Sequence, residues 1–314
     1  MPLKHFISTE DLSCDQYTCI CRAARGFQEA VEAGRTLTHL CSGKVLATAF
    51  FQESARTAAA LQSAITRLGG GHVWISSTEA ARLATEPDEM LDALRSIAAL
   101  SDVMAVRHKD LDLRAIAPHF DVPLINAMCG RHEHSLVALG LVYSLYRRFR
   151  DLRSVEIGIY GMTAYSRPAK AVIKAMSLFG GTIYEDAVID QLKAPSDIAD
   201  FVQHSGARLI KARLGDFISR VDMLMVTEGH PQPEADAAFL EEYHRSIHSV
   251  TRADLAALKP GAVMTYIMPR TLPDGRLTVE RDVDEHPQVI NRLRMREWVY
   301  AIMALINHLL DVTG

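Results

Sequence analysis

The chain has 314 residues, and its 38 acidic side chains slightly outnumber its 34 basic ones, for a formal net charge of −4. That length is enough for two domains of ordinary size. Because there is no basic block and no acidic tail, the charge pattern excludes a typical nucleic-acid-binding surface and a disordered acidic segment. We therefore expect a globular protein whose partners are small molecules.

The sequence shows no clear membrane span, signal peptide, disulfide pattern or metal-binding motif. No apolar stretch approaches the length of a membrane span, and the first nine residues lack the features of a signal peptide. The cysteines are odd in number, which predicts reduced thiols and a cytoplasmic location. The thirteen histidines are scattered, so the sequence predicts no metal site. The cysteines are Cys14, Cys19, Cys21, Cys41 and Cys129.

The first strong pattern is an apolar run over residues 45–51, which predicts a buried strand, followed by an Ala- and Leu-rich helix. Ser54, Arg56 and Thr57 open that helix. Two hydroxyls and a guanidinium therefore meet the free N–H groups of a helix N-terminus, which predicts an anion site, with phosphate favoured. The alternative is that Ser54 is a plain cap and Arg56 is solvated.

Strand and helix patterns then alternate, which is typical of parallel α/β layers. A new series begins at residue 154, so we expect the domain boundary at residues 151–153. The expected strands cover residues 72–76, 102–106, 123–126, 155–161, 182–184, 223–226 and 263–267, and the expected helices residues 88–100, 111–120, 134–149, 168–178 and 295–310.

Five short motifs, taken in order, resemble those of the aspartate/ornithine carbamoyltransferase family. They are Ser54-Ala55-Arg56-Thr57 (Ser-Thr-Arg-Thr in the family), Val106-Arg107-His108 (Met-Arg-His), residues 122–127 followed by His134 (Val-Pro-Val-Ile-Asn-Ala, then His-Pro-x-Gln), Gly161 to Arg167, and Met268-Pro269-Arg270. The resemblance implies an α/β fold with two doubly wound parallel-sheet domains joined by long helices, and an active site in the interdomain cleft. It implies that residues 1–150, with a C-terminal helix at 295–314, bind the phosphate-activated acyl donor, and that residues 151–294 bind the acceptor.

The resemblance also implies roles at the donor end. Ser54, Ala55, Arg56 and Thr57 would hold the phosphate together with Arg107. Ala55 lacks the hydroxyl of the family's first threonine but keeps its backbone N–H, at a cost of about 1 kcal/mol.

Arg56, Arg107 and His134 are the expected catalytic residues, with His134 polarising the carbonyl of the donor. The alternatives are a solvated Arg107, and a helix-capping His134 that alignment could confuse with His132.

Two departures concern substrate choice. Val137 stands where the family has the glutamine that holds the carbamoyl NH₂, and Glu228 stands where the aspartate enzymes carry an arginine. Arg167, Glu228, Met268 and Pro269 are the expected acceptor-binding residues. Because a negative charge replaces a positive one, we expect an acceptor other than L-aspartate, as in a specialised pathway.

The resemblance further implies a homotrimer, or a multiple of it, in which Ser77 and Arg82 reach the active site of a neighbouring subunit. Cys129 lies before His134; a nucleophilic role is an alternative to the simpler interpretation as a small buried thiol.

The expected function is therefore transfer of a carbamoyl or related acyl group from a phosphate-activated donor to an amine or other nucleophile, without a cofactor. Two alternatives remain at this point. The same site could run a lyase, condensing or hydrolytic reaction on a carboxylate or phosphate substrate, or the protein could be a silent homologue that acts as a binding or regulatory subunit.

Overall fold

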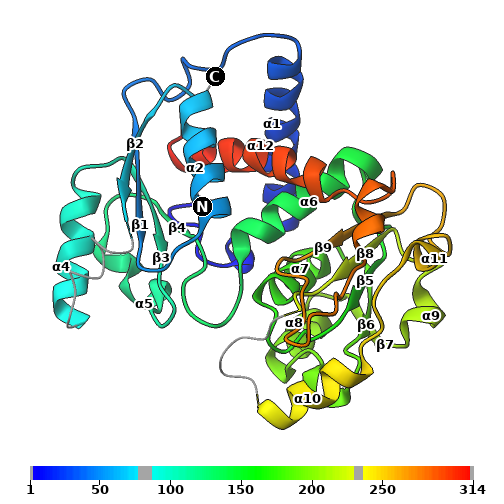
Figure 1. The fold of residues 1–314 in the computed structure, drawn as a ribbon. Helices are drawn as coiled ribbons and strands as arrows, with labels where there is room; N and C mark the ends of the chain where they lie inside the picture. Colours follow the sequence, from blue (N-terminus) through cyan, green and yellow to red (C-terminus); the bar gives the residue numbers. More distant parts are fainter. Residues whose placement is uncertain (1–2, 77–86, 230–235, 312–314) are drawn as a thin grey trace. The chain divides into compact units, whose positions relative to one another are not determined.

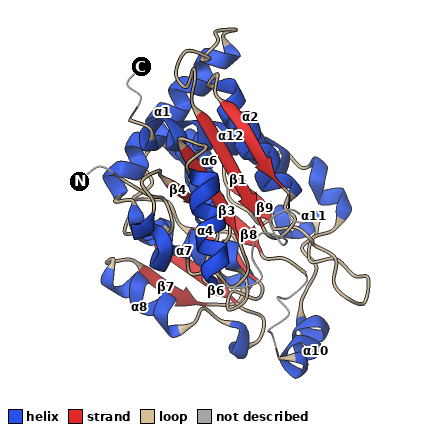
Figure 2. Ribbon diagram, turned by 90° about the vertical axis from the view of Figure 1, so that its left-hand side faces the viewer, coloured by secondary structure: helices blue, strands red, loops and turns tan. Residues whose placement is uncertain are grey.

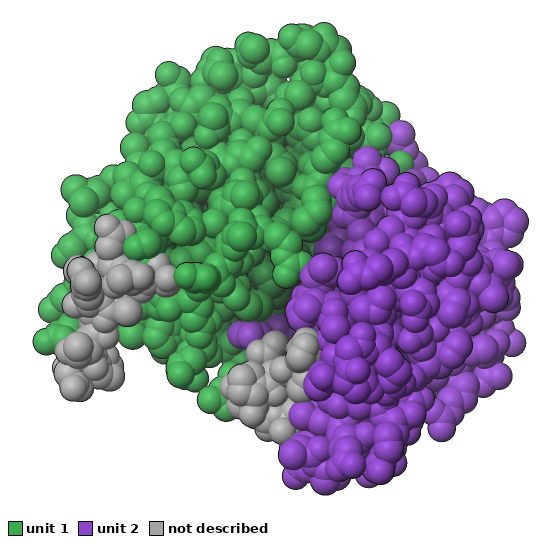
Figure 3. All heavy atoms as spheres, viewed as in Figure 1, with its two compact units in different colours: residues 1–147, 295–314 green, residues 148–294 purple. Residues whose placement is uncertain are grey.

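The fold is that of a computed structural model, which describes residues 3–76, 87–229 and 236–311 (Figure 1). The chain divides into two compact units, coloured separately in Figure 3. Unit 1 comprises residues 1–147 and 295–314, and unit 2 comprises residues 148–294. Each unit has a parallel sheet with helices on both sides, as Figures 1 and 2 show. The expected α/β class with two parallel-sheet domains is confirmed.

The sheet of unit 1 has the strand order β2-β1-β3-β4, and every pair is parallel. From β1 the chain moves first to β2 on one side and then to β3 on the other. The point where the strand order reverses therefore lies between the carboxyl ends of β1 and β3, the place where open α/β sheets bind ligands. The strands are β1 (Val45–Phe50), β2 (Gly71–Ile75), β3 (Val103–Arg107) and β4 (Leu124–Asn126).

Helices of unit 1 lie on both sides of this sheet, with α4 and α5 on one side and α1 and α2 on the other (Figure 1). The C-terminal helix packs against α6. Trp298 donates its indole N–H to the carbonyl of Leu136 at 2.7 Å, and Gly140 leaves room for the Trp298 ring, which a Cβ there would approach to 2.5 Å. The helices are α1 (Cys14–Glu32), α2 (Ala55–Arg67), α4 (Pro87–Ala98), α5 (Leu113–Ile116), α6 (Ser135–Phe149) and α12 (Asn291–Leu309).

The sheet of unit 2 has the order β7-β6-β5-β8-β9, again with parallel pairs. Its strand order reverses between β5 and β8. The strands are β5 (Ile157–Tyr160), β6 (Thr182–Asp186), β7 (Arg208–Lys211), β8 (Met223–Val226) and β9 (Val263–Tyr266). The helices are α7 (Arg167–Ser177), α8 (Ser196–His204), α9 (Leu214–Phe217), α10 (Ala237–Ser246) and α11 (Arg252–Leu255).

One predicted helix is wrong in extent. Residues 111–120 form only the single turn α5 and a 3₁₀ turn, η2 (Ala117–His119), with Pro118 inside it. Proline has no N–H to donate and its ring clashes with the preceding turn, so the α-helix cannot continue through Pro118. In the described part of the chain, no helix is both long enough and apolar enough to cross a membrane.

Candidate functional site

The N-terminus of α2 follows the carboxyl end of β1 directly. Ser54 is the N-cap residue, but its hydroxyl makes no capping bond to the backbone; it donates instead to Oγ1 of Thr57 at 3.0 Å. Thr57 is buried, whereas Arg56 is exposed. Ser54 therefore occupies the N-cap position without a side-chain capping bond, and the exposure of Arg56 agrees with the alternative of a solvated arginine. The first-turn N–H groups of α2 point out of the helix N-terminus, which lies at the carboxyl edge of the sheet. The positive end of the helix dipole there favours a bound anion.

Arg107 ends β3, and its Cα is the register partner of Phe50 at the end of β1. Its carbonyl accepts the N–H of Phe51 at 2.9 Å, and its Nη1 donates to the carbonyl of Ala127 at 3.3 Å. These contacts hold Arg107 between the loop that leads to α2 and the loop that follows β4. His108, the next residue, faces its own turn, because its Nδ1 accepts the N–H of Leu111 at 3.0 Å.

The loop after β4 carries the candidate histidine. Asn126 anchors its start by accepting the N–H groups of Met128 and Cys129 at 2.8 and 2.5 Å. His134 is buried and its ring meets the edge of Trp298, with centroids 6.3 Å apart. His132 is exposed. Of the two histidines, His134 is the one that the fold holds in a packed position.

Cys129 and Val137 are both buried near this histidine in the chain. The Cys129 thiol donates to the carbonyl of Val106 at 3.1 Å, which supports its interpretation as a structural thiol. Val137 lies in the first turn of α6, and its N–H donates to the carbonyl of His134 at 3.1 Å. No group of three or more His, Cys, Asp or Glu side chains in the described ranges is placed to hold a metal ion.

In unit 2, two of the candidate acceptor residues, Arg167 and Glu228, follow the strands β5 and β8, between which the strand order reverses. Ser166 caps α7 by accepting the N–H of Ala169 at 3.2 Å, and its hydroxyl donates to Oε2 of Glu228 at 2.7 Å. Glu228 is buried, and this burial raises the pKa of its carboxyl group. The Ser166 hydrogen bond and the positive charges of Arg167 and Lys170 act in the opposite direction. Glu228 is therefore a buried carboxyl group with a hydrogen-bond partner, and burial prevails, so its pKa lies above the ordinary value.

The segment after β9 is tied to the same edge, because the carbonyl of Pro269 accepts the N–H of Gly229 at 2.7 Å. Met268 and Pro269 are exposed. Arg270 is buried and makes two 2.8 Å hydrogen bonds to the carboxylate of Asp284. Arg270 thus anchors the loop that presents Met268 and Pro269.

Sequence reasoning missed Lys170 and Ser166. A signal was available for Lys170, because it lies three residues after Arg167 and so shares its helix face. The predicted neighbouring-subunit residues, Ser77 and Arg82, lie outside the described residues.

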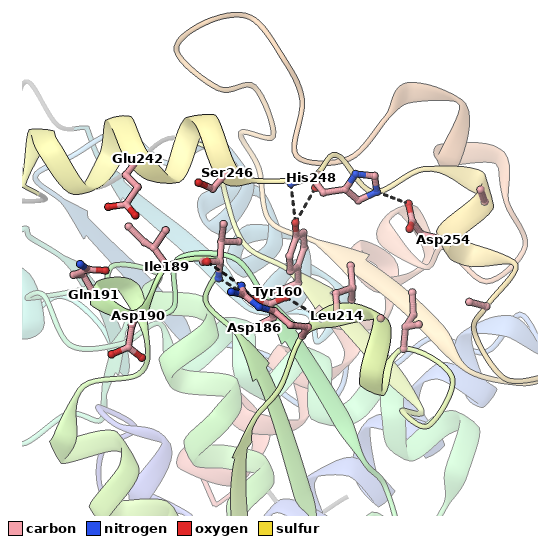
Figure 4. A pocket seen from close by; sticks show the side chains of 16 residues that line it. Tyr160, Asp186, Ile189, Asp190, Gln191, Leu214, Glu242, Ser246, His248 and Asp254 are labelled. Carbon is pink, nitrogen blue, oxygen red and sulfur yellow. Dashed lines mark hydrogen bonds and ion pairs between the residues drawn. The ribbon is translucent and has the colours of Figure 1, made fainter.

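Unit 2 also contains a pocket of about 990 Å³ that includes none of the predicted site residues (Figure 4). The hydroxyl of Tyr160 exchanges hydrogen bonds with the backbone of His248 at 2.9 and 3.0 Å, and His248 contacts Asp254 at 3.0 Å. Asp186 accepts the N–H of Leu214 at 2.8 Å. These polar groups hydrogen-bond to other groups of the pocket wall. We therefore do not include the pocket in the candidate functional site.

Comparison with known proteins decides the family. The family model described as "Aspartate/ornithine carbamoyltransferase, carbamoyl-P binding domain" matches residues 4–147. The aspartate carbamoyltransferase catalytic subunit of Methanopyrus kandleri is 31% identical over 278 residues, which cover 86% of this chain and 85% of the relative. The chain belongs to the aspartate/ornithine carbamoyltransferase family. It is thus a member of a family of transferases, as the motifs predicted.

Further relatives agree with this assignment. The aspartate carbamoyltransferase catalytic subunit of Archaeoglobus fulgidus is 29% identical over 272 residues, covering 85% of this chain and 88% of the relative. Among solved structures, the catalytic subunit of M. jannaschii aspartate transcarbamoylase superposes with a TM-score of 0.85 at 25% identity, covering 98% of each chain. The Trypanosoma cruzi enzyme with carbamoyl aspartate and phosphate has a TM-score of 0.88 at 22% identity, covering 98% of this chain and 96% of the other, which supports the fold.

The predicted avoidance of L-aspartate is wrong. These carbamoyltransferase relatives are named as aspartate enzymes, and none supports a specialised pathway. The error has a physical reason in Glu228. The prediction treated its carboxylate as a bare charge facing the acceptor, whereas Glu228 is buried, accepts a hydrogen bond from Ser166, and has a pKa that burial raises. Sequence alone does not reveal this burial or this hydrogen bond.

Proposed function

We propose that this protein transfers the carbamoyl group of carbamoyl phosphate to L-aspartate. The observation that carries the proposal is the position of Arg107 at the end of β3, where it pairs with the end of β1, the strand that leads into α2. A guanidinium and a helix N-terminus at the strand-order reversal of unit 1 suit a phosphate group. The naming of the relatives at 29–31% identity supports carbamoyl phosphate and aspartate as the substrates.

In this proposal, residues 1–150 and 295–314 bind the donor. Ser54, Ala55, Arg56 and Thr57 hold the phosphate through side chains and backbone N–H groups. Arg107 contacts both the phosphate and the carbonyl oxygen. Fixed donors of this kind position the donor and favour a dianionic leaving group.

The chemical step is nucleophilic acyl transfer. The neutral amine of aspartate attacks the carbonyl carbon, and His134 donates a hydrogen bond to the oxygen on which negative charge develops. The bond between the carbonyl carbon and the phosphate oxygen then breaks. Phosphate leaves with the bonding electron pair and accepts the proton from the amine, so that N-carbamoyl-L-aspartate and phosphate are the products.

Residues 151–294 bind the acceptor in this proposal. Arg167 holds a carboxylate of aspartate, and Met268 and Pro269 present backbone carbonyls to the carbamoyl NH₂. Such carbonyls do not depend on side-chain identity, so they can serve where Val137 offers no acceptor. Glu228 belongs to this site as the carboxylate that neighbours Arg167.

The role of His134 is tested by comparing two histidines of one loop. We expect His134→Ala to lower kcat about 10²–10³-fold, the usual cost of one oxyanion donor, with phosphate affinity retained. His132→Ala is the matched control and should keep the wild-type kcat. If His132→Ala is inactive and His134→Ala keeps its activity, the role belongs to His132 and the proposal is contradicted.

A further inference from the structure

The loop that carries His134 is fastened on its N-terminal side to the start of the chain. Asn126 donates a side-chain N–H to the carbonyl of Ile7 at 2.8 Å. Glu133, the residue before His134, is buried and accepts hydrogen bonds from the backbone N–H and the hydroxyl of Thr9, both at 2.8 Å. These contacts hold the backbone up to His134, and they do not depend on a substrate.

The first turn of α6 holds the backbone on the other side of His134. The carbonyl of His134 accepts the N–H groups of Val137 and Ala138 at 3.1 and 3.3 Å. With the backbone held on both sides, the direction of the imidazole depends on the two side-chain dihedral angles of His134, of which the second is intrinsically broad. The residues packed against the ring therefore set where its N–H group points.

Trp298, on α12, packs against that ring. Both side chains are buried, with His134 6% exposed and Trp298 4% exposed. Their ring centroids are 6.3 Å apart and the ring planes are inclined by 74°, an edge-to-face arrangement that aromatic rings favour. A large neighbouring ring at this angle restricts rotation of the imidazole, because both rings occupy a packed interior.

Trp298 is itself held in place by α6. Its indole N–H donates to the carbonyl of Leu136 at 2.7 Å. Gly140, one turn further along the helix, faces the indole, and a Cβ there would lie 2.5 Å from Cδ1 and 2.9 Å from Cγ of Trp298. A side chain at position 140 would therefore displace the ring. The indole is fixed by a hydrogen bond and occupies space that glycine leaves open.

We propose that Trp298 is a positioning residue that orients the imidazole of His134, so that its N–H points at the oxygen on which negative charge develops. Such a donor has to be held closely, since a displacement of about 1 Å can cost about 10²-fold in rate. The role of His134 itself rests on the proposed function, and the assignment of its orientation to the C-terminal helix goes beyond it.

A double-mutant cycle with His134 tests this role. Trp298→Leu should lower kcat for carbamoylation of L-aspartate about 10–100-fold and leave KM for carbamoyl phosphate within about threefold of wild type. In the His134→Ala background the same substitution should change kcat by less than about threefold, because Trp298 acts through the histidine. Trp298→Phe keeps an aromatic ring and should retain kcat within about fivefold of wild type.

Gly140→Ala displaces the indole without changing either ring. Alanine favours a helix, so α6 should persist, and the added methyl group should lower kcat about 10-fold, with no further effect in the His134→Ala background. Gly26→Ala is the matched control, because Gly26 lies within α1 and a Cβ there has nothing within 4 Å. It should keep the wild-type kcat.

NMR of histidine-labelled protein separates this role from the proposed reaction. The ring resonances of His134 are identified by their absence from His134→Ala. They should move in Trp298→Phe, Trp298→Leu and Gly140→Ala, but not in Gly26→Ala, because a nearby aromatic ring shifts the resonances of the group that it contacts. If they move in this way and wild type does not carbamoylate aspartate, the proposed function fails and the orientation of His134 by Trp298 stands.

Two kinetic results would overturn the role of Trp298. One is a wild-type kcat in Trp298→Leu or Gly140→Ala, and the other is an equal loss in the His134→Ala background, which a general structural effect would produce. Should Trp298→Leu not fold, Gly140→Ala decides by the same two criteria. Unmoved His134 resonances in Trp298→Phe would overturn the role in either case.

Discussion

Arg56 is an exposed side chain at a helix N-terminus whose capping hydroxyl is turned toward Thr57. We expect Arg56→Ala to weaken binding of inorganic phosphate about 10- to 100-fold, because a charge-assisted contact is worth about 1.5–3 kcal/mol. Isothermal calorimetry measures the affinity. Arg67→Ala, an exposed arginine in the last turn of the same helix, is the control and should bind phosphate like wild type. If a folded Arg56→Ala protein binds inorganic phosphate with unchanged affinity, the assignment of the N-terminus of α2 as the phosphate site is wrong.

Single residues show where sequence reasoning succeeds and where it fails. Arg107 could be placed from sequence, because a residue that ends a parallel strand lies at the edge where the other strands also end. The position of Glu228 after a buried strand could be predicted from sequence, but its electrostatic role could not. Its partner Ser166 is 62 residues away in the chain, and no local pattern reveals that contact or the burial that accompanies it. Because the prediction considered the charge of Glu228 without this contact, it wrongly excluded L-aspartate as the acceptor.

At the scale of elements, buried strands are the best predicted parts. Strands such as β1 and β5 are short apolar runs between turns, and this pattern is unambiguous. Edge strand β7 is half-exposed and carries Arg208 and Lys211, so it lacks that pattern and was not predicted. Helix α1 was also missed, although Ser13 and Gln16 form a capping box and the buried residues of the helix recur at helical spacing.

The loop after β9 depends on one charge network, which yields a stability prediction. Asp284 accepts two hydrogen bonds from Arg270 and one from Tyr266 at 2.6 Å. Asp284→Asn leaves the buried Arg270 without its counter-charge, and we expect a loss of about 2 kcal/mol in the free energy of unfolding, less than for a fully buried pair because Asp284 is partly exposed. Denaturant unfolding measures this loss. A change below about 0.5 kcal/mol would show that the network does not hold the loop.

The same network predicts a pH dependence. Burial alone would raise the pKa of Asp284, but the hydrogen bonds from Arg270 and Tyr266 hold that pKa below its ordinary value. A carboxyl whose pKa is lowered by folding stabilises the protein above its unfolded pKa, about 3.9 for aspartate, and the stabilisation is lost as the pH falls through the lower folded value. The stability difference between wild type and Asp284→Asn should therefore shrink below about pH 4. A difference that stays constant from pH 7 to pH 3 would contradict this assignment.

At the scale of the whole molecule, we expect a homotrimer or a multiple of it, with Ser77 and Arg82 acting in the site of a neighbouring subunit. Light scattering should give at least three times the 34.8 kDa of one chain. Arg56→Ala and Arg82→Ala should each lower the activity alone, and reassembled mixtures of the two should regain part of it, because some sites then contain neither substitution. A monomer at micromolar concentration, or mixtures without recovery, would contradict shared sites.

The central claim is carbamoyl transfer to L-aspartate, and formation of a ureido product by the wild-type protein tests it most directly. The protein is incubated with carbamoyl phosphate and L-aspartate, and N-carbamoyl-L-aspartate is measured by a colorimetric ureido assay. We predict product at an ordinary enzymatic rate, about 1–10³ per second, and a lower rate from Arg56→Ala at the same concentration of carbamoyl phosphate. Absence of N-carbamoyl-L-aspartate from a folded wild-type protein that binds carbamoyl phosphate would contradict the account.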